Sequence, residues 1–452
     1  TLVNVVDLKL FETTNSSTLS QGLNFQPGVR VETNCQNCGF QQVRINGLDG
    51  PYTQILIDSR PVFSALSGVY GLEQIPASMI ERVEVMRGGG SALFGSSAIA
   101  GTINIITKEP LRNSGQLSHT ITSLGGSSSF DNNTSLNASL VTDDHRAGLY
   151  IFGQNRYRSG YDYDGDGFTE LPKLKNQTVG FRSYLKTSTY SKLTFEYHHM
   201  QEFRRGGDML NRPPHEAHIA EQLQHSIDGG SLKFDYFSPD EKNRLSVFAS
   251  AANTDRDSYY GPGNDPLKAY GKTTDLTAMG GAQYVHTFDK CFFMPSDLTA
   301  GLEYNRDRLK DNMWGYNRHT DQTVNIYSAF LQNEWKNDRW GILIGGRLDK
   351  HNMVDNVIFS PRANLRFNPT QNINLRLSYS SGFRAPQAFD EDMHIENVGG
   401  TVAMIERAKD LKEEKSQSFS VSADMYHRFG AFQTNLLIEG FYTRLTDVFV
   451  LG

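Results

Sequence analysis

The chain has 452 residues, 38% of them hydrophobic, and a formal net charge of −6 at pH 7. The negative charge argues against a nucleic-acid-binding surface, and no stretch reaches the roughly 18 consecutive apolar residues of a membrane helix. With 27 Phe, 20 Tyr and 41 Gly, the composition favours many short strands over a helical core.

The first part of the chain consists of short segments linked by Gly, Pro and Ser. The segments include "QVRING", "QILIDSRPV", "IERVEVMRG" and "TINIIT". They predict a small α+β domain over residues 1–110. The chain starts at Thr1 with no signal peptide, so we expect a processed or partial product.

A glycine-rich stretch, "RGGGSALFGSSAIAGTINIITKEP", closes this domain. It lacks the lysine of a phosphate-binding P-loop. It also returns to a strand too quickly to open the helix of a dinucleotide site. We therefore expect glycines that permit close backbone turns, and no nucleotide.

After residue 110 the sequence alternates with period two in one segment after another. "SLKFDYF", "PRANLRFN", "INLRLSYSS" and "QSFSVSADMY" each place apolar side chains on one face and polar ones on the other. The polar faces carry several Arg, Asn and Asp, which suits a wet lumen. A membrane-crossing strand needs only about 9–11 residues. Residues 111–452 therefore predict about fifteen strands of a transmembrane antiparallel β-barrel.

The lengths of the connections support a barrel. Short connections at 142–146, 238–242 and 368–372 alternate with longer ones at 160–178, 205–226, 261–275 and 385–414. Tight turns on one rim and long loops on the other are typical of outer-membrane barrels. A soluble β-sandwich is the alternative.

The segments "QVRINGLDGPYTQILIDSRPVF" and "GLEQIPASMIERVEVMRGGGSALFGSSAIAGTINIITKEP" resemble the plug domain of a TonB-dependent outer-membrane receptor. The resemblance implies a plug at 1–110 inside a barrel that starts at 111. Transporter barrels of this kind have 22 strands. About seven strands are therefore expected beyond Gly452, and the N-terminal TonB box is not visible.

The resemblance implies a non-enzymatic importer of a bulky, scarce nutrient in the outer membrane of a Gram-negative bacterium. Its partners would be the TonB–ExbB–ExbD complex, outer-membrane lipids and, as a further candidate, a surface lipoprotein. "NCQNCGF" and "GLEQIP" resemble cobalamin receptors of Bacteroides-like bacteria, which ranks cobalamin first and haem or an iron–siderophore second. Rivals of other classes are a passive porin and a secreted carbohydrate-binding β-protein.

The acidic segment "DYDGDGFTE" resembles the start of an EF-hand loop, with carboxylates at positions 1, 3 and 5 before a glycine. Position 12 is Lys173, so Glu170 at position 9 is the nearest substitute. We expect structural Ca²⁺, and the alternative is a solvated acidic turn. The predicted ligands are Asp162, Asp164, Asp166 and Glu170.

The three cysteines leave several alternatives open. Cys35 and Cys38 form a C-x-x-C pair, which suits a redox motif, half of a metal site or a local disulfide, and Cys291 stands apart. For an exported protein we expect the disulfide, which would stiffen a loop tip. Arg82 and Arg87 are expected to pair with lumenal carboxylates.

Substrate-binding residues follow mainly from the resemblance. Plug loops around Cys35–Phe40 and Phe63–Tyr70 should point into the external vestibule. "GFRAP" resembles the F-R-A-P box of these receptors, and a histidine follows it as in haem receptors. The second haem box departs from the pattern at "AKDL". The expected ligand contacts are Phe40, Phe63, Leu66, Val69, Tyr70, Arg384 and His394.

A further histidine-rich segment, "PPHEAHIAEQLQH", could supply metal ligands at helical spacing. The alternative is a surface loop that folds over the substrate or meets a partner. The candidate ligands are His215, His218, His225, Glu216 and Glu221.

Overall fold

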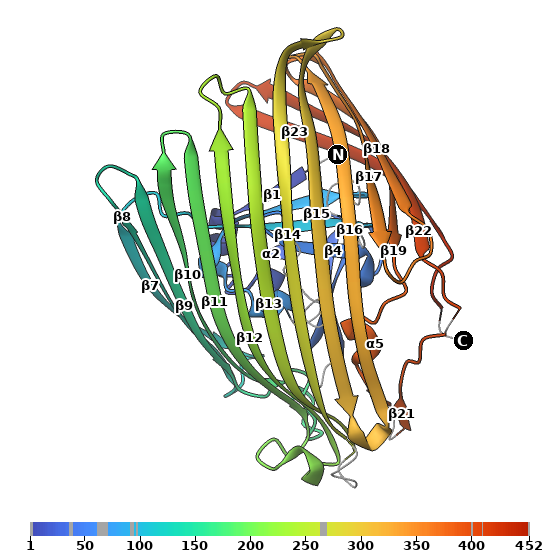
Figure 1. Cartoon of the computed structure of the whole chain (residues 1–452). Helices are drawn as coiled ribbons and strands as arrows, with labels where there is room; N and C mark the ends of the chain where they lie inside the picture. Colours follow the sequence, from blue (N-terminus) through green and yellow to red (C-terminus); the bar gives the residue numbers. More distant parts are fainter. Residues whose placement is uncertain are drawn as a thin grey trace.

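One large antiparallel sheet curves around a small N-terminal domain (Figure 1). This computed structural model describes residues 3–35, 39–60, 71–90, 95, 98–262, 269–398, 401–408 and 410–450. Among these residues the large sheet has 15 strands, which confirms the predicted fold class and strand number.

The N-terminal domain, here called the plug, contains a four-stranded sheet of order β1-β5-β6-β4, in which only the β4–β6 pair is parallel. β2 and β3 form a separate hairpin. The elements of the plug are β1 (Val3–Asp7), α1 (Leu8–Thr13), α2 (Leu19–Leu23), β2 (Val29–Cys35), β3 (Phe40–Ile45), η1 (Gly50–Tyr52), β4 (Thr53–Ile57), α3 (Gly71–Gln74), η2 (Ala77–Met79), β5 (Ile80–Arg87) and β6 (Gly101–Thr107).

The plug glycines allow close approaches of backbone and side chains. A Cβ added at Gly101 would collide with the backbone oxygen of Met86 on the neighbouring strand. A Cβ added at Gly89 would collide with the hydroxyl of Ser380 in the barrel wall. Gly88 has a φ of +81°, which a side chain rarely adopts. Gly88, Gly89 and Gly101 therefore permit close turns and packing, as the sequence predicts.

The large sheet runs in chain order from β7 to β23. Its strands are β7 (Ser114–Ser123), β8 (Phe130–Val141), β9 (Ala147–Arg158), β10 (Lys173–Ser188), β11 (Ser191–Gly207), β12 (Ile219–Phe237), β13 (Asn243–Pro262), β14 (Tyr270–Cys291), β15 (Met294–Met313), β16 (Arg318–Lys336), β17 (Trp340–His351), β18 (Ile358–Thr370), β19 (Ile373–Arg384), β22 (Glu414–Phe429) and β23 (Phe432–Thr446). The connections contain η3 (Pro214–Glu216), η4 (Trp314–Tyr316), α5 (Asp390–Met393), β20 (Glu396–Val398) and β21 (Thr401–Ala403).

The connections alternate in length as expected. The turns at 142–146 and 238–242 join consecutive strands on one rim, and the segments 159–172 and 385–413 lie on the other. Three of the predicted long loops extend into strands. β10 already begins at Lys173, and β14 begins at Tyr270. The 205–226 loop is shortened at both ends to 208–218, because β11 continues to Gly207 and β12 begins at Ile219, so the polar residues assigned to this loop belong partly to strands.

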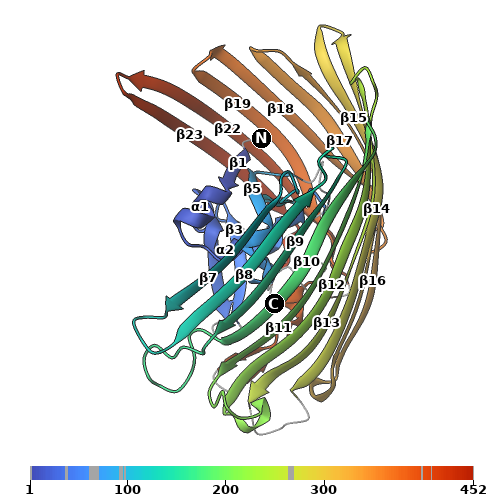
Figure 2. The ribbon, with the colours of Figure 1, turned by 90° about the vertical axis from the view of Figure 1, so that its left-hand side faces the viewer.

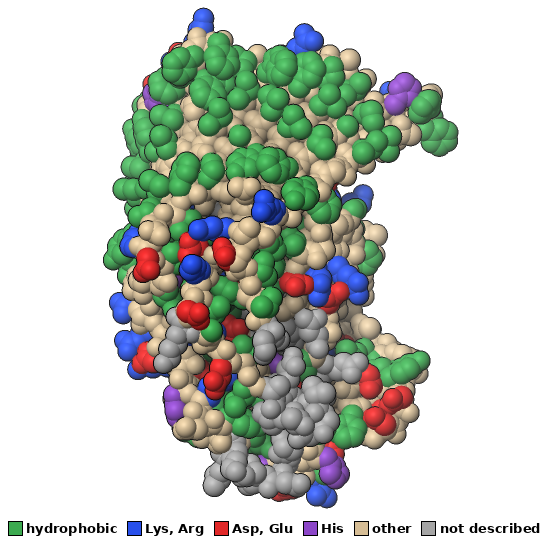
Figure 3. Space-filling model, turned by 90° about the vertical axis from the view of Figure 1, so that its right-hand side faces the viewer, with side chains coloured by type: hydrophobic (Ala, Val, Ile, Leu, Met, Phe, Trp, Pro, Cys, Tyr) green, Lys and Arg blue, Asp and Glu red, His purple; other side chains and the backbone are tan. Residues whose placement is uncertain are grey.

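The outer face of the sheet is apolar and its inner face is polar. Leu302, Leu331 and Ile344 are exposed on the outer face. Figure 3 shows hydrophobic side chains gathered in a broad band over the upper part of one side of the molecule. Buried Arg and Asp side chains line the inside. In the described part of the chain β7 and β23 are the two edge strands of the large sheet, and the plug lies in the concavity between them (Figure 2). Among the described helices, none is long and apolar enough to cross a membrane.

Candidate functional site

A buried ion-pair cluster joins the plug to the barrel wall. Glu73, in the short helix α3, lies 2.7 Å from Arg158, 3.1 Å from Arg156 and 2.8 Å from Arg204. Arg156 also pairs with Asp131 at 2.6 Å, and Arg204 with Glu202 at 2.6 Å. One helical turn of the plug is thus bound to strands β9 and β11, and Asp131 extends the cluster to β8.

The arginines determine the protonation state of Glu73. Burial alone would raise the pKa of this carboxyl, but Arg158, Arg204 and Arg156 outweigh that effect and hold the pKa far below its usual range. Glu73 is therefore ionised at every physiological pH. Breaking such a buried pair leaves uncompensated charges, which is strongly destabilising.

Two further ion pairs hold the plug against the wall. Arg182 of β10 lies 2.6 Å from Asp58 of the plug. Arg87 lies 2.7 Å from Glu439 of β23, which confirms its expected pairing with a lumenal carboxylate. Arg82 differs from the prediction, because it pairs with Glu84 two residues along its own strand at 2.8 Å. Side chains at i and i+2 of a strand share one face, so Glu84 is the nearer partner.

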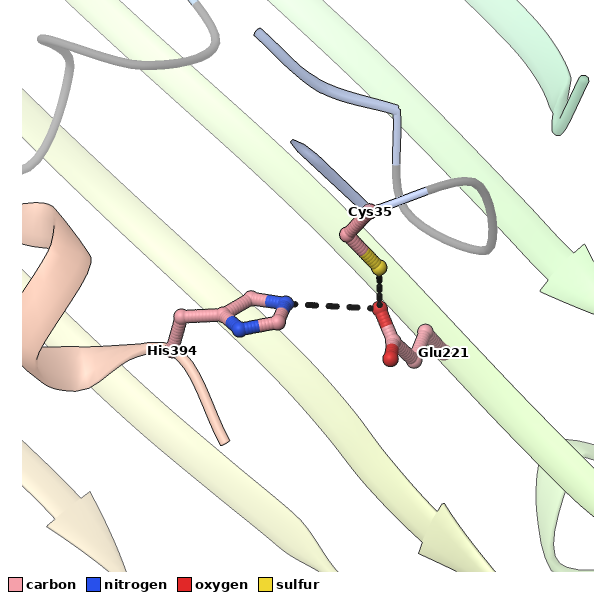
Figure 4. A group of neighbouring side chains, drawn as sticks. All are labelled: Cys35, Glu221 and His394. Atoms are coloured by element: carbon pink, nitrogen blue, oxygen red, sulfur yellow. Dashed lines mark hydrogen bonds and ion pairs between the residues drawn. The ribbon is translucent and has the colours of Figure 1, made fainter. Parts of the chain in front are cut away.

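Three side chains from separate parts of the chain meet at the long-loop rim (Figure 4). Cys35 ends β2 of the plug, Glu221 belongs to β12, and His394 follows α5. The thiol donates to Glu221 Oε2 at 3.2 Å, and His394 Nε2 lies 3.5 Å from the same oxygen. Burial lowers the pKa of His394, but hydrogen bonds to Cys35 and Glu221 outweigh it and raise this pKa to about 10.

The other predicted ligand contacts fall into two groups. Arg384 is buried at the end of β19, with its guanidinium 4.3 Å from the centre of the Phe389 ring and 3.6 Å from Glu414. It is therefore already engaged within the protein. Phe63, Leu66, Val69 and Tyr70 lie outside the described residues, and so does the side chain of Phe40, whose backbone starts β3. Cys38 also lies outside them, so the disulfide stays a prediction.

The predicted calcium ligands converge in the loop between β9 and β10. Single carboxylate oxygens of Asp162, Asp164, Asp166 and Glu170 lie within 4.8 Å of one another. The amide of Gly165 donates to Asp162 at 2.7 Å, and the amide of Gly167 donates to it at 2.9 Å. Hard oxygen ligands of this kind suit Ca²⁺.

The histidine-rich segment does not form one cluster. His215 contacts Tyr270 at 2.9 Å, and His218 pairs with Asp208 at 2.5 Å. His225 is buried 3.6 Å from Glu202. The helical spacing assumed for a metal site is wrong, because residues from Ile219 onward form a strand whose side chains alternate between faces.

Two family models match the chain. The TonB-dependent Receptor Plug Domain matches residues 1–102, and the TonB dependent receptor-like β-barrel matches residues 102–452. The chain belongs to the TonB-dependent receptor family. The receptor is therefore an outer-membrane β-barrel protein with an N-terminal plug.

Relatives of the receptor differ in their named substrates. The Vitamin B12 transporter BtuB of Vibrio vulnificus is 23% identical over 85% of this chain and 60% of its own length. The ferric enterobactin receptor of Pseudomonas aeruginosa is 36% identical over 21% of this chain and 14% of its own length. The receptor chain therefore spans about 60% of the length of the B12 transporter.

Solved structures show the same fold. The siderophore receptor PirA of Acinetobacter baumannii matches with a TM-score of 0.79 at 19% identity, over 98% of this chain and 77% of that one. The Pseudomonas aeruginosa receptor PfeA matches with a TM-score of 0.79 at 18% identity, over 98% of this chain and 70% of that one. At these identities the likeness describes the architecture of the receptor alone.

Sequence reasoning missed the role of Glu73. The signal was present, since "GLEQIP" places one carboxylate beside apolar residues that a plug would bury. Its partners lie more than 80 residues away in the chain, and no local pattern connects them. A charged residue inside an otherwise apolar plug segment is the observation that could have found it.

Proposed function

We propose that the receptor imports a scarce nutrient that is too bulky for a passive porin. In this proposal TonB, energised by ExbB–ExbD, pulls on the plug and remodels it. The cluster around Glu73 carries the proposal, because a plug bound by buried ion pairs closes the lumen until work is done on it. The outer membrane has no ATP, so that work must come from a partner.

A corrinoid is the first candidate substrate. The B12 transporter of Vibrio vulnificus aligns with 85% of the chain. The loops of the vestibule rim are also acidic. Segment 159–172 has four acidic residues and no basic ones, and segment 385–413 has seven acidic and three basic residues. The negative electrostatic potential of these loops repels anions and leaves a neutral corrinoid unaffected.

An iron–siderophore is the second candidate. Solved siderophore receptors match the fold over nearly the whole chain, and a ferric enterobactin receptor is 36% identical over 107 residues. Ferric catecholates are anionic, so the acidic rim argues against that class. A neutral or cationic siderophore would not be repelled.

A structural Ca²⁺ belongs to the same proposal. Asp162, Asp164, Asp166 and Glu170 would bind the ion and order a loop that faces the substrate. The ion would also reduce the negative charge of the rim. Its ligand set of carboxylates favours Ca²⁺ over softer metals.

Uptake assays in the native bacterium test the substrate and the energy source. We expect a deletion strain to lose uptake of radiolabelled cyanocobalamin and the full-length gene to restore it. Restored uptake should disappear when TonB is also deleted. Normal corrinoid uptake together with lost ferric-siderophore uptake would contradict the corrinoid proposal. Uptake that continues without TonB would contradict energised import.

A further inference from the structure

The cluster of Cys35, Glu221 and His394 brings together a sulfur, an oxygen and a nitrogen donor. Cys35 of the plug supplies the sulfur, Glu221 of the barrel wall supplies the oxygen, and His394 of the 385–413 loop supplies the nitrogen (Figure 4). The side chains of Glu221 and His394 are 2% and 10% exposed. Glu221 and His394 are therefore largely enclosed by protein where plug, wall and loop meet, and Cys35 beside them is half-buried.

The spacing of the donor atoms matches the coordination shell of a small metal ion. Around a tetrahedral Zn²⁺ with bonds of about 2.0–2.3 Å, neighbouring ligand atoms lie about 3.3–3.6 Å apart. Glu221 Oε2 lies 3.2 Å from the Cys35 sulfur and 3.5 Å from His394 Nε2. One ligand atom from each of the three residues lies within 4.8 Å of the others. The two distances to Glu221 Oε2 therefore match those of a tetrahedral shell.

The charge on Glu221 points to a cation as well. Glu73 and Glu202 are equally buried carboxylates, and arginines neutralise both. Among the described residues, the ion pairs of Glu221 include no Lys or Arg, and His394 at 3.5 Å is its partner. The thiol and the imidazole that contact Glu221 Oε2 both ligate metal ions once they lose a proton. A divalent cation would replace those protons and compensate the negative charges of the carboxylate and the thiolate.

We propose that Cys35, Glu221 and His394 bind one divalent transition-metal ion of the Zn²⁺ class. Mixed N, O and S donors favour Zn²⁺ over Ca²⁺ or Mg²⁺, which prefer oxygen alone. The edge-to-face contact of Tyr260 at 5.3 Å orients the imidazole. Three protein ligands leave a fourth position for water or an exchangeable group.

The bound ion would tie together three parts that import must move apart. β2 of the plug, strand β12 and the 385–413 loop share no chain neighbours, so the metal would act as a crosslink at the mouth of the lumen. The proposal holds for any imported substrate and can be tested without one. It competes with the Cys35–Cys38 disulfide, since a cysteine in a disulfide has no thiolate to offer.

The test uses the full-length receptor, purified in detergent and kept reduced. Co²⁺ replaces Zn²⁺ as the probe, because a cobalt–thiolate bond absorbs light in the near ultraviolet. We expect one Co²⁺ per chain and this absorption band in the wild type. Cys35→Ser should abolish the band, and Glu221→Gln or His394→Asn should weaken binding by at least about 10-fold, the lower limit for losing even an outer-shell partner.

Two cysteine variants serve as controls. Cys291 lies at the β14–β15 turn on the opposite rim, so Cys291→Ser should bind Co²⁺ like the wild type. Cys38→Ser removes the competing disulfide and should keep the band. Circular dichroism checks that each variant has folded into a β-barrel. If one ligand variant does not fold, the remaining ligand variants provide the test.

Three results would overturn the proposal. The first is a folded, reduced wild type that binds no stoichiometric Co²⁺ or Zn²⁺. The second is a thiolate band that survives Cys35→Ser or disappears in Cys38→Ser. The third is mass spectrometry that finds a Cys35–Cys38 disulfide in every receptor molecule isolated from cells. A receptor that binds the metal ion but imports no nutrient would contradict the proposed function without contradicting this metal site.

Discussion

Glu73 illustrates how a single charge can hold a domain in place. Its folded pKa lies below the ordinary value of 4.5, so ionisation of Glu73 stabilises the plug in its docked position. That contribution is complete above pH 4.5 and is lost progressively as the pH falls below it. Protonation leaves Arg156, Arg158 and Arg204 with less compensating charge in a buried environment.

We expect Glu73→Gln to weaken plug docking by about 3–5 kcal/mol, the cost of breaking a buried ion pair. Hydrogen exchange of β4, β5 and β6 in the full-length receptor measures the effect. In the wild type, protection should fall as the pH is lowered from 5 to 3, after correction for intrinsic exchange. In the variant this pH dependence should be much smaller.

The matched control for this prediction is Glu12→Gln, because Glu12 is an exposed carboxylate on α1 of the same domain. It should leave protection unchanged within about 0.5 kcal/mol. Equal protection in Glu73→Gln and wild type would mean that apolar packing alone docks the plug.

At the scale of elements, the β9–β10 loop should respond to calcium. We expect EGTA to increase proteolysis within 159–172 and Ca²⁺ to restore protection, with a Kd of about 0.1–1 mM as in extracellular modules. Asp162→Asn should abolish the Ca²⁺ effect, because this residue also accepts the two glycine amides. Limited proteolysis followed by mass spectrometry measures both.

A conservative change on the opposite rim controls for general charge effects. Asp144 lies in the 142–146 turn, and Asp144→Asn should retain the full response to Ca²⁺. If EGTA changes nothing in the wild type, the segment is a solvated acidic turn.

The barrel elements differ in how well the sequence predicts them. The 142–146 and 238–242 turns lie where polar clusters interrupt clear alternation, and the structure places them there. The start of β12 was missed, because Glu221 and His225 point into a polar interior and hide the strand pattern. The convergence of Cys35, Glu221 and His394 depends on contacts across hundreds of residues, which no local pattern encodes.

At the scale of the whole molecule, an apolar outside and a charged inside reverse the arrangement of a soluble protein. Arg156 and Arg204 are fully buried, while Leu331 on the outer face is 56% exposed. The sequence predicts this reversal, because alternation determines which residues share a face and the polar face is too charged for a core. The match between individual plug and wall residues could not be predicted, since it depends on how the sheet curves.

We therefore expect a charge on the outer face to be far more costly than the same charge inside. Leu331→Arg should destabilise the full-length receptor in lipid vesicles by about 2–4 kcal/mol, the cost of arginine near the bilayer midplane of a barrel. Gln332→Arg, one residue along β16 and on the other face, should cost clearly less, because it enters a polar lumen. Urea-dependent folding into vesicles measures both. Equal costs would mean that lipid does not cover this face, and the membrane-spanning architecture would have to be abandoned.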